Sequence, residues 1–270
     1  MGKIIAIASQ KGGVGKTITA LNLGHCMSRL GSRIMLIDGD PQGGMGITSN
    51  LSKQTDLGLM NLLKNEAKPE EIIFTTKEKT MSVVWLGSIQ PSEVLFLESE
   101  ARSGTFGMLI RSLTEGYDYI IIDAPAGVGG IAASLLSISD SVIMAINCRA
   151  ISLKTIPLFL KLIKSIKSDL NPRLLFEGAL ITMFDSKKDL ERQILGQIRK
   201  SLPNDAFFKT MIPYDEYYEK ASLHSVPIAM MPKGVQAARP YFELALELKE
   251  KELMVEKEGE GDEEDIVGLF

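Results

Sequence analysis

The residues from 10 to 17 have the types and the spacing of a loop that could hold phosphate groups. They read Gln10-Lys11-Gly12-Gly13-Val14-Gly15-Lys16-Thr17. Glycines let backbone N–H groups surround phosphate oxygens, and a helix that follows adds positive potential at its N-terminus. At this spacing Lys16 would reach the β- and γ-phosphates of a nucleotide, and the hydroxyl of Thr17 would hold Mg²⁺. We therefore predict a nucleotide site that extends from Lys11 to Ile18 in the first turn of the helix.

Two aspartates stand where apolar segments end, and both are candidates for the metal site. Asp38 follows the apolar run 34–37, and Asp123 follows the run 119–122. A buried carboxylate costs free energy unless a cation compensates its charge. We predict that Asp123 contributes to a Mg²⁺ site, with the alternative that it caps the next helix. Asp38 would support either Mg²⁺ or the loop after it, unless its role is structural.

Short apolar runs alternate with helical stretches along most of the chain. The runs expected to form strands are 4–8, 34–37, 83–86, 119–122, 142–146, 174–182 and 207–212. Expected helices between them include 16–30, 152–168 and 187–201. Continuous apolar strands separated by helices indicate a mostly parallel sheet that is covered on both faces. We predict an α/β fold of the P-loop kind, three layers α/β/α around a twisted sheet, with ligands at the carboxyl ends of the strands.

Length and composition fit a globular protein. The chain has 270 residues, of which 45% are hydrophobic and 24% charged, as is usual for soluble domains. No apolar run approaches the roughly 20 residues that span a bilayer, and the first residues do not fit a signal peptide. The two cysteines, Cys26 and Cys148, have no metal-ligand spacing. The expected location is the cytoplasm.

Charge is unevenly distributed along the chain. From Glu247 to the end there are ten acidic residues against three lysines, whereas Arg149 to Lys209 carries twelve basic and six acidic residues. We predict a domain over residues 1–250 and an acidic, disordered tail over 251–270. The last five residues are apolar again and fit either a short docking peptide or a frayed end.

A strict P-loop has glycine at the position of Gln10, and this departure together with Lys11 is informative. The segment resembles the deviant Walker A box, KGGVGKT, of the ParA/MinD family of ATPases, and the chain looks closest to the ParA/Soj type. The resemblance covers about residues 3 to 247. Further stretches that resemble family motifs are 37–43 (DxDPQG), 117–127 (Walker B and second switch), 178–186 and 209–228 (nucleotide-base loop).

The resemblance implies roles for individual residues. Lys11 would reach across a dimer interface to the partner's nucleotide, and Asp40 would position the attacking water. Pro213 and Asp215 stand where the family packs against the base, and Asp185 is either a further base contact or a loop residue. The implied activity is slow hydrolysis of ATP with Mg²⁺, driven by positioning and by neutralisation of charge.

In this family ATP traps a homodimer, and ParA-like dimers bind DNA without sequence specificity. Salt-sensitive phosphate contacts of that kind need exposed basic residues. The candidates here are Lys154, Lys161, Lys164, Lys187, Lys188 and Arg192. Two departures stand out: the acidic segment 214–219 removes positive charge, and Arg149 replaces a Glu that the family often has. An activating ParB-like or adaptor protein is the expected partner.

Three functions remain open at this point. The first is a DNA-associated ATPase switch that positions or segregates a plasmid, a chromosome or a large protein assembly, in the cytoplasm and associated with the nucleoid. The second is a MinD-like or flagellar-placement regulator that acts through protein partners or a membrane. The acidic tail argues against the membrane, because surface-binding helices are rich in Lys and Arg. The third is a nucleotide-gated binding module with negligible hydrolysis.

Overall fold

The computed structural model describes residues 2–77 and 79–267, and of residues 255–267 the backbone alone. The strands are β1 (Lys3–Ala8), β2 (Ile34–Asp38), β3 (Phe74–Thr75), β4 (Met81–Val84), β5 (Tyr119–Asp123), β6 (Ser141–Asn147), β7 (Leu175–Phe184) and β8 (Phe207–Pro213). The α-helices are α1 (Lys16–Arg29), α2 (Gly44–Thr48), α3 (Leu59–Leu63), α4 (Pro69–Ile72), α5 (Glu93–Arg102), α6 (Thr105–Ser112), α7 (Gly130–Ile138), α8 (Ala150–Asp169), α9 (Asp189–Arg199), α10 (Glu216–Leu223) and α11 (Gly234–Val267).

All these strands belong to one sheet with the order β3-β4-β2-β5-β1-β6-β7-β8. Every pairing is parallel except that of β3 with β4 at one edge. The predicted parallel α/β sheet is therefore confirmed, and all seven predicted strands are present. Only β3 was missed, because two residues are too few to give a periodic signal.

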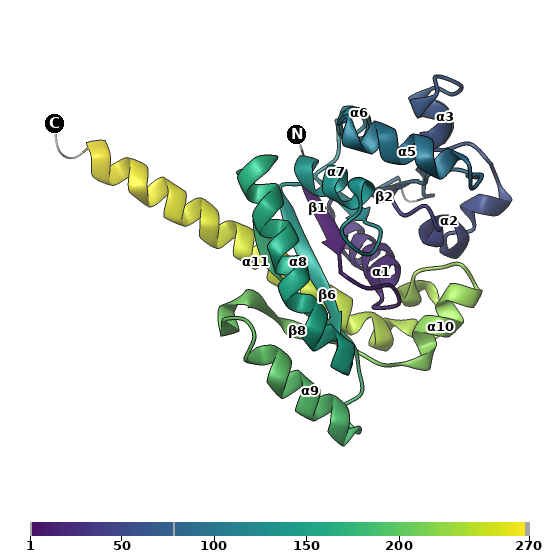
Figure 1. Cartoon of the computed structure of the whole chain (residues 1–270). Coiled ribbons are helices and arrows are strands. Elements are labelled where there is room, and N and C mark those ends of the chain that lie inside the picture. Colours follow the sequence, from purple (N-terminus) through teal and green to yellow (C-terminus); the bar gives the residue numbers. More distant parts are fainter. Residues whose placement is uncertain (1, 78, 268–270) are drawn as a thin grey trace.

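Helices cover both faces of the sheet, as the continuous apolar strands predicted. Side chains of β1 show why: Ile4 and Ala6 pack into one core, whereas Ile5 and Ile7 pack into the other. The first core is closed by α5, α6, α7, α8 and α9, and the second by α1, α10 and α11. Figure 1 shows α7 and α8 in front of the sheet and α11 behind it. The three-layer α/β/α prediction is thus confirmed.

Helix α11 is fastened to the sheet near the predicted end of the domain. The Nζ of Lys3 lies 2.8 Å from Glu252 and 2.9 Å from Glu177, and the hydroxyl of Tyr119 donates to Glu252 over 2.6 Å. Lys251 Nζ donates to the backbone oxygen of Glu177 over 2.8 Å. Contacts with the body therefore continue past residue 250.

The tail differs from the sequence-based expectation. The tail 251–270 was expected to be disordered, whereas the structure continues α11 through it as far as Val267. Six of the residues 251–267 are Glu, a good helix former, so a helix already stabilised by packing can extend into this segment. The division into a domain and a tail remains a prediction, and residues 268–270 of the apolar end lie outside the described residues. Within the described part of the chain, no helix has the length and hydropathy needed to cross a membrane.

Candidate nucleotide-binding site

The predicted phosphate loop connects β1 to α1 at the carboxyl edge of the sheet. Gly13 and Gly15 have φ angles of +69° and +83°, a conformation that glycine adopts without a steric penalty. The loop is tied down from the side, because the hydroxyl of Thr182 at the end of β7 donates to the backbone oxygen of Val14 over 2.7 Å. The strand, the turn and the helix N-terminus are thus arranged as a phosphate cradle requires.

The sheet brings the two predicted carboxylates together. Asp38 ends β2 and Asp123 ends β5, and these two residues are paired in the register of the adjacent strands. Both are fully buried. The hydroxyl of Thr17 donates to Asp123 Oδ2 over 2.5 Å. Neighbouring parallel strands end at one edge, so residues 85 positions apart in sequence share the site.

The oxygen atoms of Thr17 and Asp123 fit a Mg²⁺ site. Among the described residues, Asp123 Oδ1 is buried without a hydrogen-bond partner, and a second oxygen donor, Thr17, lies beside the carboxylate. No three His, Cys, Asp or Glu side chains of the described chain converge on one point. A site with few protein ligands suits Mg²⁺, which keeps several waters and binds phosphate oxygens. Thr17 and Asp123 are the residues that would hold it.

Burial and like charge dominate the electrostatics of this pair. The pKa of Asp123 is raised by burial and then by the negative charge of Asp38. The pKa of Asp38 is also raised by burial, although backbone N–H bonds oppose the shift. The buried ammonium of Lys16 acts in the other direction and favours the ionised form of Asp123. A bound divalent cation would remove the cost of holding two carboxylates side by side.

Asp38 holds the loop that carries Asp40. Its Oδ1 accepts from the backbone N–H of Asp40 at 3.2 Å, and its Oδ2 accepts from Met45 at 2.9 Å and Gly46 at 3.2 Å, in the first turn of α2. Both oxygens are therefore engaged with backbone amides. This arrangement favours the loop-supporting alternative for Asp38, and direct contact with the metal remains a prediction.

A cavity of about 430 Å³ opens beside the phosphate loop. Lys16, Thr17 and Ile18 line one side together with Asp40, and Pro213 and Asp215 line the other. Most of the predicted phosphate residues, together with Pro213 and Asp215, therefore face one hollow that is large enough for a nucleotide. The lining residues that were not predicted include Thr182, Met183, Tyr214, Tyr218 and Tyr241.

The missed tyrosines give the base side of the cavity an aromatic wall. The rings of Tyr218 and Tyr241 meet edge to face, with centroids 5.8 Å apart. Tyr241 lies within 3.4 Å of the Thr19 hydroxyl on α1. No local pattern points to Tyr241, because it reaches the cavity only through the packing of α11 on α1. Tyr218 could have been found as an aromatic residue within the stretch that resembles a base loop.

Two predicted residues of the loop lie elsewhere. Val14 is buried, and Lys11 is exposed on the outer side of the loop, where both border a small second cavity with the first turns of α8. Asp185, the candidate base contact, does not line the nucleotide cavity. Its carboxylate faces Lys188 at 3.3 Å and accepts from the backbone N–H of Lys187, which supports the loop alternative.

The basic residues predicted to bind DNA fall into two groups. Lys154, Lys161 and Lys164 are exposed on α8, and none of the ion pairs among the described residues involves them. Lys187 is also exposed. In contrast, Lys188 pairs with Asp185 and Glu191, and Arg192 pairs with Asp189. Paired cations carry less free positive charge, so the first group is the better candidate for phosphate contacts.

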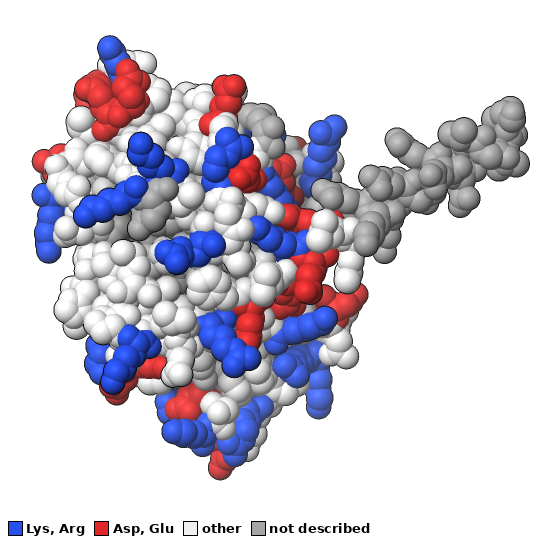
Figure 2. Space-filling model, turned by 180° about the vertical axis from the view of Figure 1, so that it is seen from behind, with Lys and Arg blue, Asp and Glu red and all other residues white. Residues whose placement is uncertain are grey.

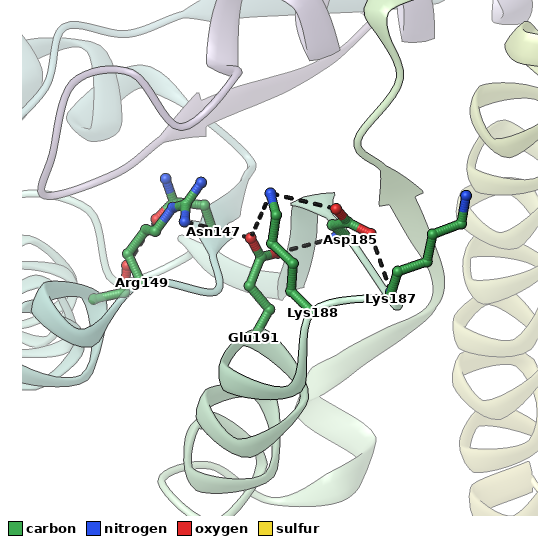
Figure 3. A network of polar contacts seen from close by, with 7 residues as sticks. Asn147, Arg149, Asp185, Lys187, Lys188 and Glu191 are labelled. Atoms are coloured by element: carbon green, nitrogen blue, oxygen red, sulfur yellow. Dashed lines mark hydrogen bonds and ion pairs between the residues drawn. The ribbon is translucent and has the colours of Figure 1, made fainter.

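Arg149 takes part in the same polar network. Its guanidinium lies 3.3 Å from Glu191 Oε1, and the Glu191 side chain is only 4% exposed. Figure 3 shows Arg149 and Lys188 turned toward Glu191 from the starts of α8 and α9. The other oxygen of Glu191 accepts from the backbone N–H of Asp185 at 2.9 Å. Arg149 therefore compensates a buried carboxylate within its own chain.

The buried Asp123 leads to a prediction about stability. Without a metal ion, Asp123→Asn should raise the free energy of unfolding by about 1 to 3 kcal/mol at pH 8, because it removes a buried charge next to Asp38. A raised folded-state pKa means that the native protein binds the proton more tightly than the unfolded chain does. Wild-type stability should therefore fall as pH rises from about 4, the ordinary carboxyl value, toward the raised pKa of Asp123.

Thermal unfolding in EDTA at pH 6 and pH 8 tests this prediction. The gain from Asp123→Asn should be larger at pH 8, and the variant should lose Mg²⁺-dependent hydrolysis. A variant that is less stable than the wild type at both pH values would show that the carboxylate is well compensated without metal.

Known proteins resemble this chain over most of its length. A family model described as AAA domain matches residues 2–176. The sporulation initiation inhibitor protein Soj of Bacillus subtilis is 34% identical over 254 residues, which are 92% of this chain and 98% of Soj. The chromosome partitioning protein ParA of Myxococcus xanthus is 30% identical over 93% of this chain and 89% of its own length. Among solved structures, the fold is similar to that of the septum site-determining protein MinD of Pyrococcus horikoshii, which was solved with Mg-ADP. The TM-score is 0.73 at 23% identity, and the match covers 91% of this chain and 95% of MinD.

Proposed function

Because the chain belongs to the ParA/MinD family of ATPases, we propose that it is an ATP-dependent dimerising switch that positions or segregates a cargo. The observation that carries this proposal is that Lys16, Thr17 and Asp40 line one cavity together with the base-side residues Pro213 and Asp215. The cofactors are ATP and Mg²⁺. The cargo would be a plasmid, a chromosome or a large protein assembly, handled in the cytoplasm on the nucleoid.

The proposed reaction is attack of water on the γ-phosphorus in line with the bond to the β-phosphate oxygen. That bond breaks, and ADP and phosphate leave. Lys16 would hold the β- and γ-phosphates, and Asp40 would orient the water and accept its proton. Mg²⁺ at Thr17 and Asp123 would neutralise charge on the phosphate oxygens. Asp40 is part of a loop that Asp38 holds in place, which would help to fix the Asp40 carboxylate for this role.

In the proposed switch, dimerisation would depend on which nucleotide is bound. The side chain of Lys11 is exposed on the phosphate loop rather than directed into its own cavity. An exposed lysine at this place is suited to contact the phosphates of a second subunit, the role that the family resemblance implies. Two lysines per nucleotide, one from each subunit, would then make the dimer depend on the γ-phosphate.

The proposed dimer would bind DNA through the unpaired lysines of α8. Lys154, Lys161 and Lys164 lie on the exposed side of a helix whose Ile156, Phe159 and Ile163 are buried, and α8 is in the foreground of Figure 1. On the opposite face of the molecule, Lys and Arg side chains are interspersed with Asp and Glu rather than gathered into one patch (Figure 2). We expect contacts with phosphates and therefore little sequence preference.

A DNA-binding titration tests the DNA step of the proposal. Random duplex DNA should bind with ATP and Mg²⁺ at low salt, and much more weakly with ADP or without nucleotide. The double variant Lys161→Ala/Lys164→Ala should lower the ATP-dependent affinity about tenfold and reduce the slope of log K against log salt by about one per lysine. Measuring the wild type and the variant at two salt concentrations gives both quantities.

A control variant that loses two lysines elsewhere shows whether the loss of affinity depends on α8 or only on the total charge. Lys53 and Lys68 are exposed on the far part of the chain between β2 and β3, and their replacement by alanine should leave the affinity within about twofold. Equal losses in the two double variants would contradict the assignment to α8.

A MinD-like regulator that acts through protein partners is the second candidate. It is favoured by the acidic Glu216 and Glu219 of α10, of which Glu219 lines the cavity, because they replace positive charge that could meet DNA. If the wild type hydrolyses ATP but does not bind DNA at low salt, this candidate replaces the first. Co-sedimentation with vesicles and ATP then distinguishes a membrane target from a protein target.

A further inference from the structure

The helix that follows the second switch loop starts against a carboxylate from a different helix. Helix α7 begins after the loop 124–129, which connects it to Asp123. Its N-terminal flanking residue is Gly129, which has no side chain to cap the helix, and no side-chain cap bond is formed there. Glu98 of α5 lies over this end, since α5 packs on α7.

Two glycines make room for this carboxylate. A Cβ atom on Gly130 would lie 2.5 Å from Glu98 Oε2, and one on Gly129 would lie 3.3 Å from Glu98 Oε1. Real Cβ atoms do not approach an oxygen as closely as 2.5 Å, so any other residue at 130 would force Glu98 to move. The close approach of Glu98 thus depends on the absence of a side chain at Gly130.

The carboxylate has few other partners. Among the described residues, Glu98 Oε2 is buried without a hydrogen bond. The nearest cation, Arg102 Nε, is 4.0 Å away on a side chain that is 76% exposed, so this pair contributes little. The positive end of the α7 dipole provides a further favourable field around the carboxylate.

The start of α7 is connected to the nucleotide site through the switch loop. The backbone N–H of Gly127 donates to Ser9 at 3.0 Å, and that of Ala124 donates to Ile7 at 3.1 Å. The loop is therefore held at one side by β1 and by Ser9, which leads from β1 into the phosphate loop, and at the other by the first turn of α7. A shift of the first turn of α7 would therefore also move the switch loop, which begins directly after Asp123.

We propose that Glu98 is a positioning residue for ATP hydrolysis, which fixes the first turn of α7 through Gly129 and Gly130 and thereby sets the switch loop 124–129. This inference rests on the proposed ATPase function. Glu98 does not line the nucleotide cavity. Its influence is therefore on the rate of the chemical step rather than on the affinity for nucleotide.

Steady-state kinetics of full-length variants test this role. Glu98→Gln should lower kcat about fivefold, in the range of a lost carboxylate at a helix N-terminus, while KM for ATP and the affinity for ADP change less than about twofold. Gly130→Ala should have a similar effect, because its Cβ displaces the carboxylate. Gly130 has no positive φ, so alanine adds no backbone strain there.

The double variant shows whether the two substitutions act through the same contact or independently of each other. Glu98→Gln/Gly130→Ala should be no slower than the slower single variant, whereas independent effects would multiply to about twenty-fivefold. Glu100→Gln, two residues along α5 on the opposite side of the helix, should match the wild type.

Unchanged kcat in Glu98→Gln with an active wild type would overturn this inference and leave the ATPase function intact. So would multiplicative losses, or an equal loss in Glu100→Gln. A wild type that neither binds nor hydrolyses ATP would overturn the proposed function itself and this inference with it.

Discussion

Lys16→Ala is expected to abolish measurable ATP binding, with an affinity at least about 100-fold below that of the wild type. Lys16 opens α1, is buried, and lines the cavity beside Thr17. Among the described residues that line the cavity, Lys16 is the only cation, and its ammonium would face the phosphates of a bound nucleotide. Without it, the phosphate charge would lose its charge-assisted hydrogen bonds in a poorly hydrated place, where such bonds are strongest. Calorimetry or a fluorescent ATP analogue with Mg²⁺ measures the loss.

The matched control is Lys11→Ala in the same loop. Because Lys11 is exposed and does not line the cavity, the monomer should keep its ATP affinity within about threefold while ATP-dependent dimerisation is lost. Circular dichroism and thermal unfolding without nucleotide should show both variants folded. If Lys16→Ala binds ATP as tightly as the wild type, the phosphate loop has been assigned wrongly.

Asp40→Ala is expected to bind ATP nearly normally and to hydrolyse it at least about 100-fold more slowly, the usual contribution of a positioned general base. Asp40 lines the same cavity as Lys16. Its Oδ1 accepts from the backbone N–H of Gln42 at 3.0 Å, and its backbone oxygen accepts from Gly43 at 2.8 Å. The loop thus keeps its main support from Asp38 when the Asp40 carboxylate is removed, so nucleotide binding should survive.

Phosphate release under saturating ATP, with binding measured separately, distinguishes the two effects. Asp40→Asn should lose activity as well, because it keeps the size but not the proton acceptor. Asp56→Asn is a suitable control, since Asp56 is exposed and bonds to Ser88 away from the cavity. Normal hydrolysis by Asp40→Ala would show that another group orients the water.

These two variants also separate the proposed states of the switch. Lys16→Ala should be fixed in the nucleotide-free state, and Asp40→Ala should accumulate in the ATP state. If DNA binding depends on the ATP dimer, Asp40→Ala should stay bound to DNA while ATP is present, and Lys16→Ala should not bind. The proposed dimerising switch would thus depend on whether the bond between the β- and γ-phosphates is intact.

The sequence by itself determined the fold class and the phosphate loop. Both are local properties: a buried strand, a glycine-rich turn and a helix start are consecutive in the chain from Lys3 to Arg29, and apolar runs alternate with helices throughout. The strand-end positions of Asp38 and Asp123 followed from the same runs. That these two would be neighbours depended on the strand order, in which β5 inserts between β2 and β1.

Only the tertiary structure decided what each polar side chain faces. Tyr241 reaches the cavity because α11 packs on α1. The charge of Lys188 is compensated because the buried Glu191 lies between it and Arg149. Glu98 meets Gly130 because α5 lies across the start of α7. Such contacts join residues that are far apart in sequence or on different elements. The periodicity of apolar residues predicts which side of a helix or strand is buried. The register of the strands and the packing of the helices determine which residues that side contacts.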